Sequence, residues 1–372
     1  MLRIKMLLLL LTFAICGFAQ DVTLFIGTYT GTGSKGIYVY RFNTTTGKAT
    51  WVSNTDSVIN PSYLAVSNNG KFVYSVTESG GKFPGKISAF AFNETTGTLK
   101  FLNAQTSGGD NPCYVSVTKD GKWVAVGNYT GGNLSVYKTN TNGSLKPSAQ
   151  FIQHKGTGPN KERQEKAHVH SVVFSPDGKF LFVPDLGMDK VMIYKFKDIS
   201  NLPLEPADQD FQSTTPGAGP RHIIFHPTKA YAYLINEMAG SVNVYDYKKG
   251  SLTTVQTIAT HPESFTELPG SADIHISPDG KFLYASNRGV ENNIAIFSID
   301  ETSGQLTNIG YQSTLGETPR NFVIDPTGHF LLAANQNSGN IVIFKRDMQT
   351  GLLEATGEEI KIPKPVCLKM LP

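Results

Sequence analysis

The chain has 372 residues, of which 40% are hydrophobic and 17% charged, with 36 Gly, 15 Tyr and 22 Phe. This composition excludes a disordered or coiled-coil protein and indicates a β-rich globular fold with many turns. The formal net charge is only +3, and such a small excess of basic residues does not favour nucleic acid as a partner.

The N-terminal segment, residues 1–19, is predicted to be a secretory signal peptide. Arg3 and Lys5 form a short positive region, residues 6–15 form a compact apolar run, and small residues precede the expected cleavage site. The segment is too short for a membrane span. Lipid anchoring at Cys16 is a minor alternative, because a poor residue for that signal precedes it.

Cleavage leaves residues 20–372, with 31 basic and 30 acidic groups, since two of the 33 basic residues belong to the leader. We expect a periplasmic or secreted protein that binds neither nucleic acid nor a membrane once the signal is removed. Export permits a disulfide between Cys113 and Cys367. The repeat described next places these cysteines in units that are not neighbours, so two buried thiols are expected instead.

A turn phrase recurs along the mature chain. Residues 175–182 (SPDGKFLF) return almost unchanged as residues 277–284 (SPDGKFLY), and looser copies are centred on positions 70, 121, 229 and 328. Each turn lies between two alternating apolar runs, which is typical of a β-hairpin. Two further strands follow each hairpin, and the copies are 48 to 57 residues apart. Four antiparallel strands at this period indicate β-propeller blades.

The two ends of the mature chain complete one more blade. Residues 24–29 resemble the second strand of a unit, and residues 364–371 resemble the first strands at residues 60–64 and 111–115. We therefore expect the last segment to join the first blade as its innermost strand, which leaves no open sheet edge. The prediction is an all-β, seven-bladed propeller formed as a single domain by residues 20–372.

The repeat register places chemistry at one end of the predicted channel. The second residue of each innermost strand should be Ser62, Cys113, His170, Arg221, Ala272, Arg320 and Val366. The residue that follows each second strand should be Glu78, Tyr129, Leu186, Glu237, Arg288, Gln336 and Tyr29. These two strands are antiparallel, so the start of one and the end of the other share a face of the disc.

Nine of the residues near this face are candidates for function. The catalytic candidates are Glu237, His170, Arg221 and Arg288, and the substrate-binding candidates are His168, Arg320, Glu78, His222 and Tyr29. Any one of them could be an ordinary polar residue of a propeller rim. Several arginines beside a histidine and a glutamate, however, form a pocket that accepts an anion and contains a base.

Other chemistries are weakly supported. The segment His168-Val169-His170 could bind a metal if His222 or Glu237 supplied a third ligand, but no third ligand stands at a suitable spacing, and we expect neither metal nor cofactor. No Gly-x-Ser-x-Gly elbow is present, and the glycine-rich residues 27–33 lack the features of a P-loop.

Two further features have structural or open interpretations. Asn or Asp precedes five of the strand-end positions, and we expect these short side chains to bond the loop backbone: Asn128, Asp185, Asn236, Asn287 and Asn335. The loop of residues 155–166 is long enough to overhang the channel as a lid, or it is a plain surface excursion.

Several motifs resemble those of the seven-bladed lactonase family of the 6-phosphogluconolactonase type, which is related to carboxymuconate lactonising enzymes. The motifs are residues 25–29 (FIGTY), 163–171 (RQEKAHVHS), 185–187 (DLG), 219–222 (GPRH), 236–237 (NE) and 286–288 (SNR). The resemblance spans the mature chain, although Ala167 stands where the family often has Pro. It implies hydrolysis of a sugar lactone or phospholactone without a metal.

In this hypothesis Glu237 activates water, His170 donates or shuttles the proton, and the guanidinium groups of Arg221 and Arg288 hold the carbonyl oxygen and the anionic end of the substrate. Two alternatives remain open. The same groups would serve a lactonising cyclase of the carboxymuconate type, and the arginines alone would serve a non-catalytic periplasmic propeller that binds sugar acids. A closed propeller folds alone, so a monomer or weak oligomer is expected.

Overall fold

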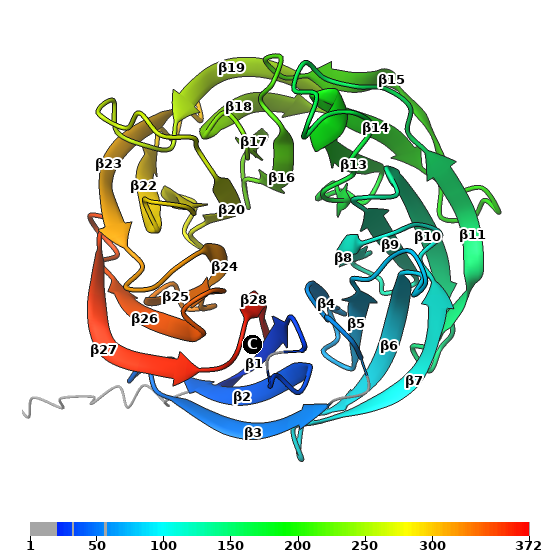
Figure 1. Ribbon diagram of the computed structural model, residues 1–372, viewed down its shortest axis with the longest axis horizontal. Coiled ribbons are helices and arrows are strands. Elements are labelled where there is room, and N and C mark those ends of the chain that lie inside the picture. Colours follow the sequence, from blue (N-terminus) through cyan, green and yellow to red (C-terminus); the bar gives the residue numbers. More distant parts are fainter. Residues whose placement is uncertain (1–20, 32, 56–57, 372) are drawn as a thin grey trace, which may run out of the picture.

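The computed structural model describes residues 21–31, 33–55 and 58–371. The predicted signal peptide lies outside the described residues. Seven four-stranded antiparallel sheets stand in a ring around a common axis (Figure 1), and the predicted seven-bladed propeller is therefore confirmed. The described residues contain one short 3-10 helix, η1 (Leu186–Met188). None of their helices is long and apolar enough to cross a membrane.

Each blade contributes one strand to each of four concentric layers (Figure 1). The innermost strands are β4 (Leu64–Val66), β8 (Pro112–Val117), β12 (Val173–Phe174), β16 (Pro220–Phe225), β20 (Ser271–Ile276), β24 (Pro319–Ile324) and β28 (Pro365–Leu371). The second strands are β1 (Asp21–Thr28), β5 (Phe72–Thr77), β9 (Trp123–Asn128), β13 (Phe180–Asp185), β17 (Tyr231–Asn236), β21 (Phe282–Asn287) and β25 (Phe330–Asn335).

The third strands are β2 (Ile37–Asn43), β6 (Lys86–Asn93), β10 (Asn133–Thr139), β14 (Lys190–Phe196), β18 (Ser241–Lys248), β22 (Asn293–Ile299) and β26 (Asn340–Arg346). The outermost strands are β3 (Ala49–Thr55), β7 (Thr98–Thr106), β11 (Leu145–Gln153), β15 (Leu204–Ser213), β19 (Ser251–Ala259), β23 (Leu306–Ser313) and β27 (Leu353–Lys361).

The ring closes as the repeat predicts. β28 pairs antiparallel with β1, with Leu368 opposite Ile26, so the C-terminal segment is the innermost strand of the first blade (Figure 1). Both cysteines are buried free thiols, as expected. The Cys367 sulfur also accepts a hydrogen bond from the Leu64 amide at 3.3 Å, which ties the closing strand to the next blade.

Packing between blades explains why the middle strands lack a polar face. Every residue of β9 is buried, because a blade is covered on both sides by its neighbours. The turns between third and fourth strands complete these contacts. Gly250 adopts φ 88° directly over the Phe180 ring of the preceding blade, and a Cβ there would lie 2.3 Å from that ring. Any larger residue at position 250 would therefore push the two blades apart.

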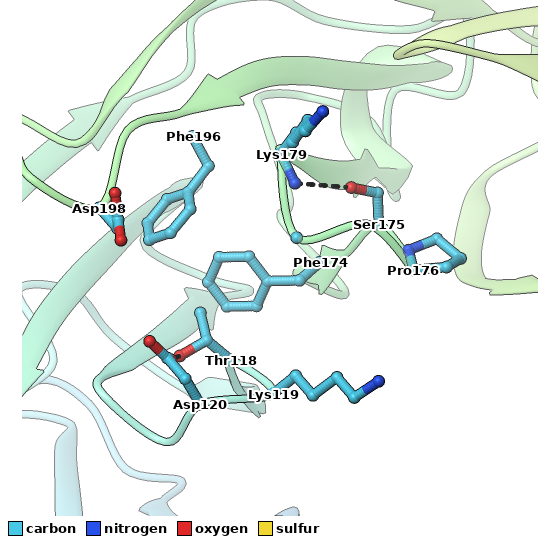
Figure 2. Close-up of a pocket in the computed structure, with 10 residues that line it drawn as sticks. Thr118, Lys119, Asp120, Phe174, Ser175, Pro176, Lys179, Phe196 and Asp198 are labelled. Carbon is cyan, nitrogen blue, oxygen red and sulfur yellow. Dashed lines mark hydrogen bonds between the residues drawn. The ribbon is translucent and has the colours of Figure 1, made fainter.

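The fourth blade departs from this pattern on the face opposite the starts of the innermost strands. Its hairpin of residues 197–203 contains no glycine. A depression of about 330 Å³ lies beside it, and Figure 2 shows the rings of Phe174 and Phe196 next to each other among its lining residues. Among its polar groups, the Asp120 carboxylate already accepts the Thr118 hydroxyl. The depression contains no histidine among its lining residues.

Candidate active site

The opposite end of the channel holds a cavity of about 460 Å³. Its lining residues are Tyr29, Glu78, Cys113, Tyr129, Arg163, His170, Glu237, Arg288 and Arg320. The ends of β5, β17 and β21 deliver Glu78, Glu237 and Arg288 to it, because each residue directly follows its strand. The structure thus brings together six of the nine candidates from hundreds of residues apart.

Glu237 is the electrostatic centre of the cavity. Its Oε1 accepts the Arg163 Nη2 group at 2.7 Å, and its Oε2 lies 3.1 Å from both Arg221 Nε and Arg288 Nη2. Burial by itself would raise the pKa of this carboxyl group. The neighbouring Arg288, His170, Arg221 and Arg163 side chains together outweigh burial and hold the pKa of Glu237 well below its ordinary value. Glu237 is therefore ionised at neutral pH.

His170 stands beside this carboxylate. Its Nε2 lies 3.7 Å from Glu237 Oε2, and its Nδ1 lies 3.8 Å from the sulfur of Cys113. Burial, with Arg221 as the next contribution, lowers the pKa of His170 well below 6.5. Its imidazole is therefore neutral at neutral pH. Burial also raises the pKa of the Cys113 thiol to about 12, so this sulfur stays protonated.

A second group of polar residues occupies the other side of the cavity. The Tyr29 hydroxyl donates to Glu78 Oε2 at 2.9 Å, and the Arg320 guanidinium lies over the Tyr29 ring, 5.7 Å from its centre. Burial is the largest influence on the pKa of Arg320, but Tyr29, Glu78 and Glu237 outweigh it and raise that pKa. Within the part of the chain that the structure describes, Arg320 forms no hydrogen bond or ion pair.

Arg221 and His222 lie beneath the cavity rather than on its wall. The Arg221 side chain is 2% exposed, and its Nη1 donates to the Ala272 carbonyl at 2.6 Å. His222 Nδ1 donates to Asp273 Oδ1 at 2.8 Å, and burial followed by Arg221 lowers the pKa of His222 to about 3. Arg221 is therefore a buried counter-ion of Glu237, and His222 belongs to a polar layer that closes the channel below it.

His168 also lies off the cavity. Its ring stacks on Tyr129 with centroids 4.5 Å apart, its Nδ1 donates to the Tyr129 carbonyl at 3.0 Å, and its Nε2 lies 3.1 Å from Glu165 Oε2. His168 lies two residues before His170, so the alternation of a continuous strand would point both side chains the same way. Alternation does not hold here, because β12 contains only two residues and a single bridge at Val169 precedes it. His168 thus supports Tyr129 and the neighbouring loop.

This geometry bears on the metal alternative. His168 and His170 have different partners and do not converge. Across the described ranges, no group of three or more His, Cys, Asp or Glu residues is arranged to hold a metal ion.

Four of the five residues predicted to bond the loop backbone do so, whereas Asn236 donates to the side chains of Ser241 and Asn243 instead. Asn128, Asn287 and Asn335 each donate from Nδ2 to a carbonyl near the end of an outermost strand, those of Ser107, Thr260 and Thr314. The Asp185 carboxylate is buried and accepts from His154 Nδ1 and from the amides of His168 and Gly187. These bonds fix the loops that carry the cavity residues.

Three lining residues were not among the candidates. Cys113 and Tyr129 occupy the same register positions as His170 and Glu237, so the repeat located them without indicating a role. Arg163 lies in the loop of residues 155–166, outside every repeat unit. Its side chain overhangs the cavity, so this loop contributes to the site.

The comparisons with known proteins agree with the fold. The family model described as Lactonase, 7-bladed beta-propeller matches residues 23–370. Two proteins named 6-phosphogluconolactonase, from Formosa agariphila and Bacillus subtilis, are 43% and 37% identical over 93% of this chain and cover 99% and 97% of their own lengths. The solved structure of the periplasmic gluconolactonase PpgL of Pseudomonas aeruginosa has a TM-score of 0.90 and 36% identity, covering 95% of this chain and 99% of that one.

Proposed function

Because the chain belongs to the seven-bladed β-propeller lactonase family, we propose that it hydrolyses a sugar lactone bearing an anionic group, such as 6-phosphogluconolactone. Its relatives place it among lactone-hydrolysing enzymes. The proposed reaction site is the cavity around Glu237.

The charge of the cavity supports an anionic substrate. Three arginines and two glutamates line it, and Arg221 lies directly behind Glu237, so positive charge exceeds negative charge by two. Arg163, Arg221 and Arg288 are all paired with Glu237. Arg320 alone retains its full set of donors for a ligand, and a guanidinium binds phosphate or carboxylate in bidentate fashion. This unpaired arginine is the observation that carries the proposal.

The proton chemistry is assigned to His170 rather than to Glu237 as first expected. A carboxylate held ionised by several cations is a weak proton acceptor, whereas neutral His170 has an available nitrogen. The 3.7 Å gap between His170 Nε2 and Glu237 Oε2 is too long for a direct hydrogen bond. The water molecule that attacks the lactone would contact both atoms and would give one proton to His170. Glu237 would stabilise the imidazolium that forms.

The remaining groups act on the lactone. As water adds to the carbonyl carbon, negative charge develops on the carbonyl oxygen, and Arg288 is the cation on the cavity wall that can meet it. Two backbone carbonyls, of Gly270 and Ser271, hold the Arg288 guanidinium in place. The bond between carbonyl carbon and ring oxygen then breaks, and the His170 imidazolium returns its proton to that oxygen. The product is the open-chain sugar acid.

We also propose that the protein acts outside the cytoplasm. The predicted signal peptide supports this, and one relative, PpgL, is described as periplasmic. Monomer or weak oligomer remains the expected assembly.

The test is turnover of a lactone panel by the mature protein, comparing phosphorylated, carboxylated and neutral sugar lactones with Glu237→Gln alongside. We expect the anionic lactones to be preferred, and the variant to lose at least a hundredfold in kcat/KM, because three arginines lose their shared anion. Closure of an unsaturated dicarboxylate without lactone hydrolysis would favour the cyclase. Tight binding of a sugar acid without turnover of any lactone would favour the non-catalytic binder.

A further inference from the structure

The longest connection between blades carries Arg163. It runs between β11 and β12, from residue 154 to residue 172, and its residues 155–166 lie outside every repeat unit. Its backbone is firmly held. The Gln164 side chain is buried and donates to the Leu186 carbonyl at 2.9 Å and to Asp189 Oδ1 at 2.7 Å. Asn160 Oδ1 accepts the amides of Glu162 and Arg163. The loop is therefore a fixed platform.

The three arginines that contact Glu237 are not equivalent. Backbone carbonyls anchor Arg221 and Arg288, whose side chains are 2% and 17% exposed. Arg163 is 44% exposed at its side chain, and among the described residues its guanidinium hydrogen-bonds only to Glu237 and, at 3.3 Å, to the Tyr129 hydroxyl. Arg163 can therefore leave Glu237 by a rotamer change alone, whereas the other two cannot.

The two oxygens of Glu237 are divided between these partners. Oε2 faces Arg221, Arg288 and His170, while Oε1 accepts a hydrogen bond from Arg163 and from no other residue that the structure describes. With Arg163 in place, three cations share the charge of Glu237, and little of it remains to stabilise an imidazolium at His170. If Arg163 moves away, one cation leaves the surroundings of His170, and its base strength rises.

We propose that Arg163 couples the charge of the substrate to the reactivity of the site: an anionic group held by Arg320 draws Arg163 off Glu237 and thereby activates His170. Arg163 then binds the anion together with Arg320, and its departure leaves Glu237 with one cation fewer. A phosphate dianion carries two charges, and Arg320 alone compensates one of them. Neutral lactones leave Arg163 where it is, so they are turned over slowly. This inference rests on the proposed function and explains how that site favours charged lactones.

The charged and titratable groups around the pair are few. Glu237 and His170 are faced by Arg163, Arg221, Arg288, His222, Cys113 and Tyr129, and across the cavity by Arg320, Glu78 and Tyr29. Burial and neighbouring carboxylates keep the Tyr29 and Cys113 groups protonated at neutral pH. Of the three arginines paired with Glu237, Arg163 is the one that no backbone carbonyl anchors within the described residues, so a shift of the acidic limb of kcat/KM in an Arg163 variant reports on this arginine.

The test compares Arg163→Met with the wild type on 6-phosphogluconolactone and on neutral gluconolactone. We expect KM for the phosphorylated lactone to rise at least tenfold, while kcat for the neutral lactone rises about threefold because His170 becomes the stronger base. The acidic limb of kcat/KM should move to higher pH in the variant. Lys161→Met removes an exposed cation from the same loop and is the matched control, with no change expected for either substrate.

Equal losses for both lactones, or an acidic limb that does not move, would overturn the inference and leave Arg163 as a structural residue. Calorimetry separates this result from failure of the proposed function, because it needs no turnover. Arg163→Met should weaken binding of 6-phosphogluconate at least tenfold and leave binding of gluconate within twofold. Equal affinities of wild type and variant for 6-phosphogluconate would contradict the clamp even in a protein that hydrolyses neither lactone.

Discussion

Replacing Arg320 tests the anion anchor most sharply. Arg320→Met removes the guanidinium that forms no hydrogen bond or ion pair within the described residues, while nearly preserving the bulk that packs over Tyr29. A hydrogen bond to a charged group contributes about 1.5 to 3 kcal/mol, so loss of a bidentate contact should cost about 3 kcal/mol or more. At about 1.4 kcal/mol per tenfold, this predicts at least a hundredfold loss of kcat/KM on 6-phosphogluconolactone.

The loss should depend on the charge of the substrate. Neutral gluconolactone has no group for Arg320 to bind, so its kcat/KM should change less than fivefold. Both reactions can be followed by proton release with a pH indicator, after subtraction of spontaneous lactone hydrolysis. Arg320→Lys keeps the charge without the planar fork and should give an intermediate loss.

Two outcomes would refute this reasoning. An equal fall for both lactones would make Arg320 a general structural residue, and thermal unfolding of each variant would then show whether the fold is intact. Unchanged activity on the phosphorylated lactone would mean that the anion binds elsewhere.

Three further predictions concern the fold and its pH dependence. The kcat/KM of the wild type should stay level from pH 8 to 6.5 and fall only at lower pH, because burial keeps the pKa of His170 below 6.5; a fall already complete at pH 7 would contradict this. The native pKa of His222 is about 3, below the ordinary value of about 6.5, so at acidic pH the unfolded chain binds more protons at this group than the native protein does. The contribution of His222 to the free energy of unfolding is therefore fully present above pH 6.5, and about 2 kcal/mol of it is lost between pH 6.5 and pH 5. Urea unfolding at both pH values measures this loss, and His222→Gln should reduce the change in the free energy of unfolding between them. Leu368→Ala should cost about 2 to 5 kcal/mol, since Leu368 is fully buried on the closing strand, and deletion of residues 364–372 should abolish soluble folding; a stable truncated monomer would show that closure is dispensable.

Much of the fold was predictable because one turn phrase fixes a register. The match between residues 175–182 and 277–284 sets the ends of the second strands, and Glu237 and Arg288 lie one residue beyond β17 and β21 as predicted. The starts of two innermost strands were predicted wrongly, because Ser62 and His170 precede β4 and β12. Ring closure was predictable for the same reason: the C-terminal segment matched the first strand of a unit that lacked one. Periodicity therefore gave positions at one end of the channel without any knowledge of side-chain contacts.

The rest depended on contacts that periodicity does not contain. Arg163 stands in a loop without a repeat partner, so no register located it. The orientation of His168 failed to follow strand alternation because its segment is not a continuous strand. The depth of Arg221 depends on how far each innermost strand tilts into the channel, which residue order does not give.

The assignment of proton transfer shows the same limit. A glutamate near a histidine suggests that the glutamate is a base, but the basicity of a carboxylate depends on how many cations it is paired with. Three arginines converge on Glu237 from separate elements, and one of them is Arg163. Only the folded arrangement indicates that the neutral histidine is the better proton acceptor.

A crystal structure of the protein with 6-phosphogluconate, the expected product, would test the central claim most directly. We expect the phosphate to lie on Arg320 and Arg163, with the carboxylate within hydrogen-bonding distance of Arg288 and His170. Occupancy of the depression beside Phe174 and Phe196 instead, with the channel cavity empty, would contradict it.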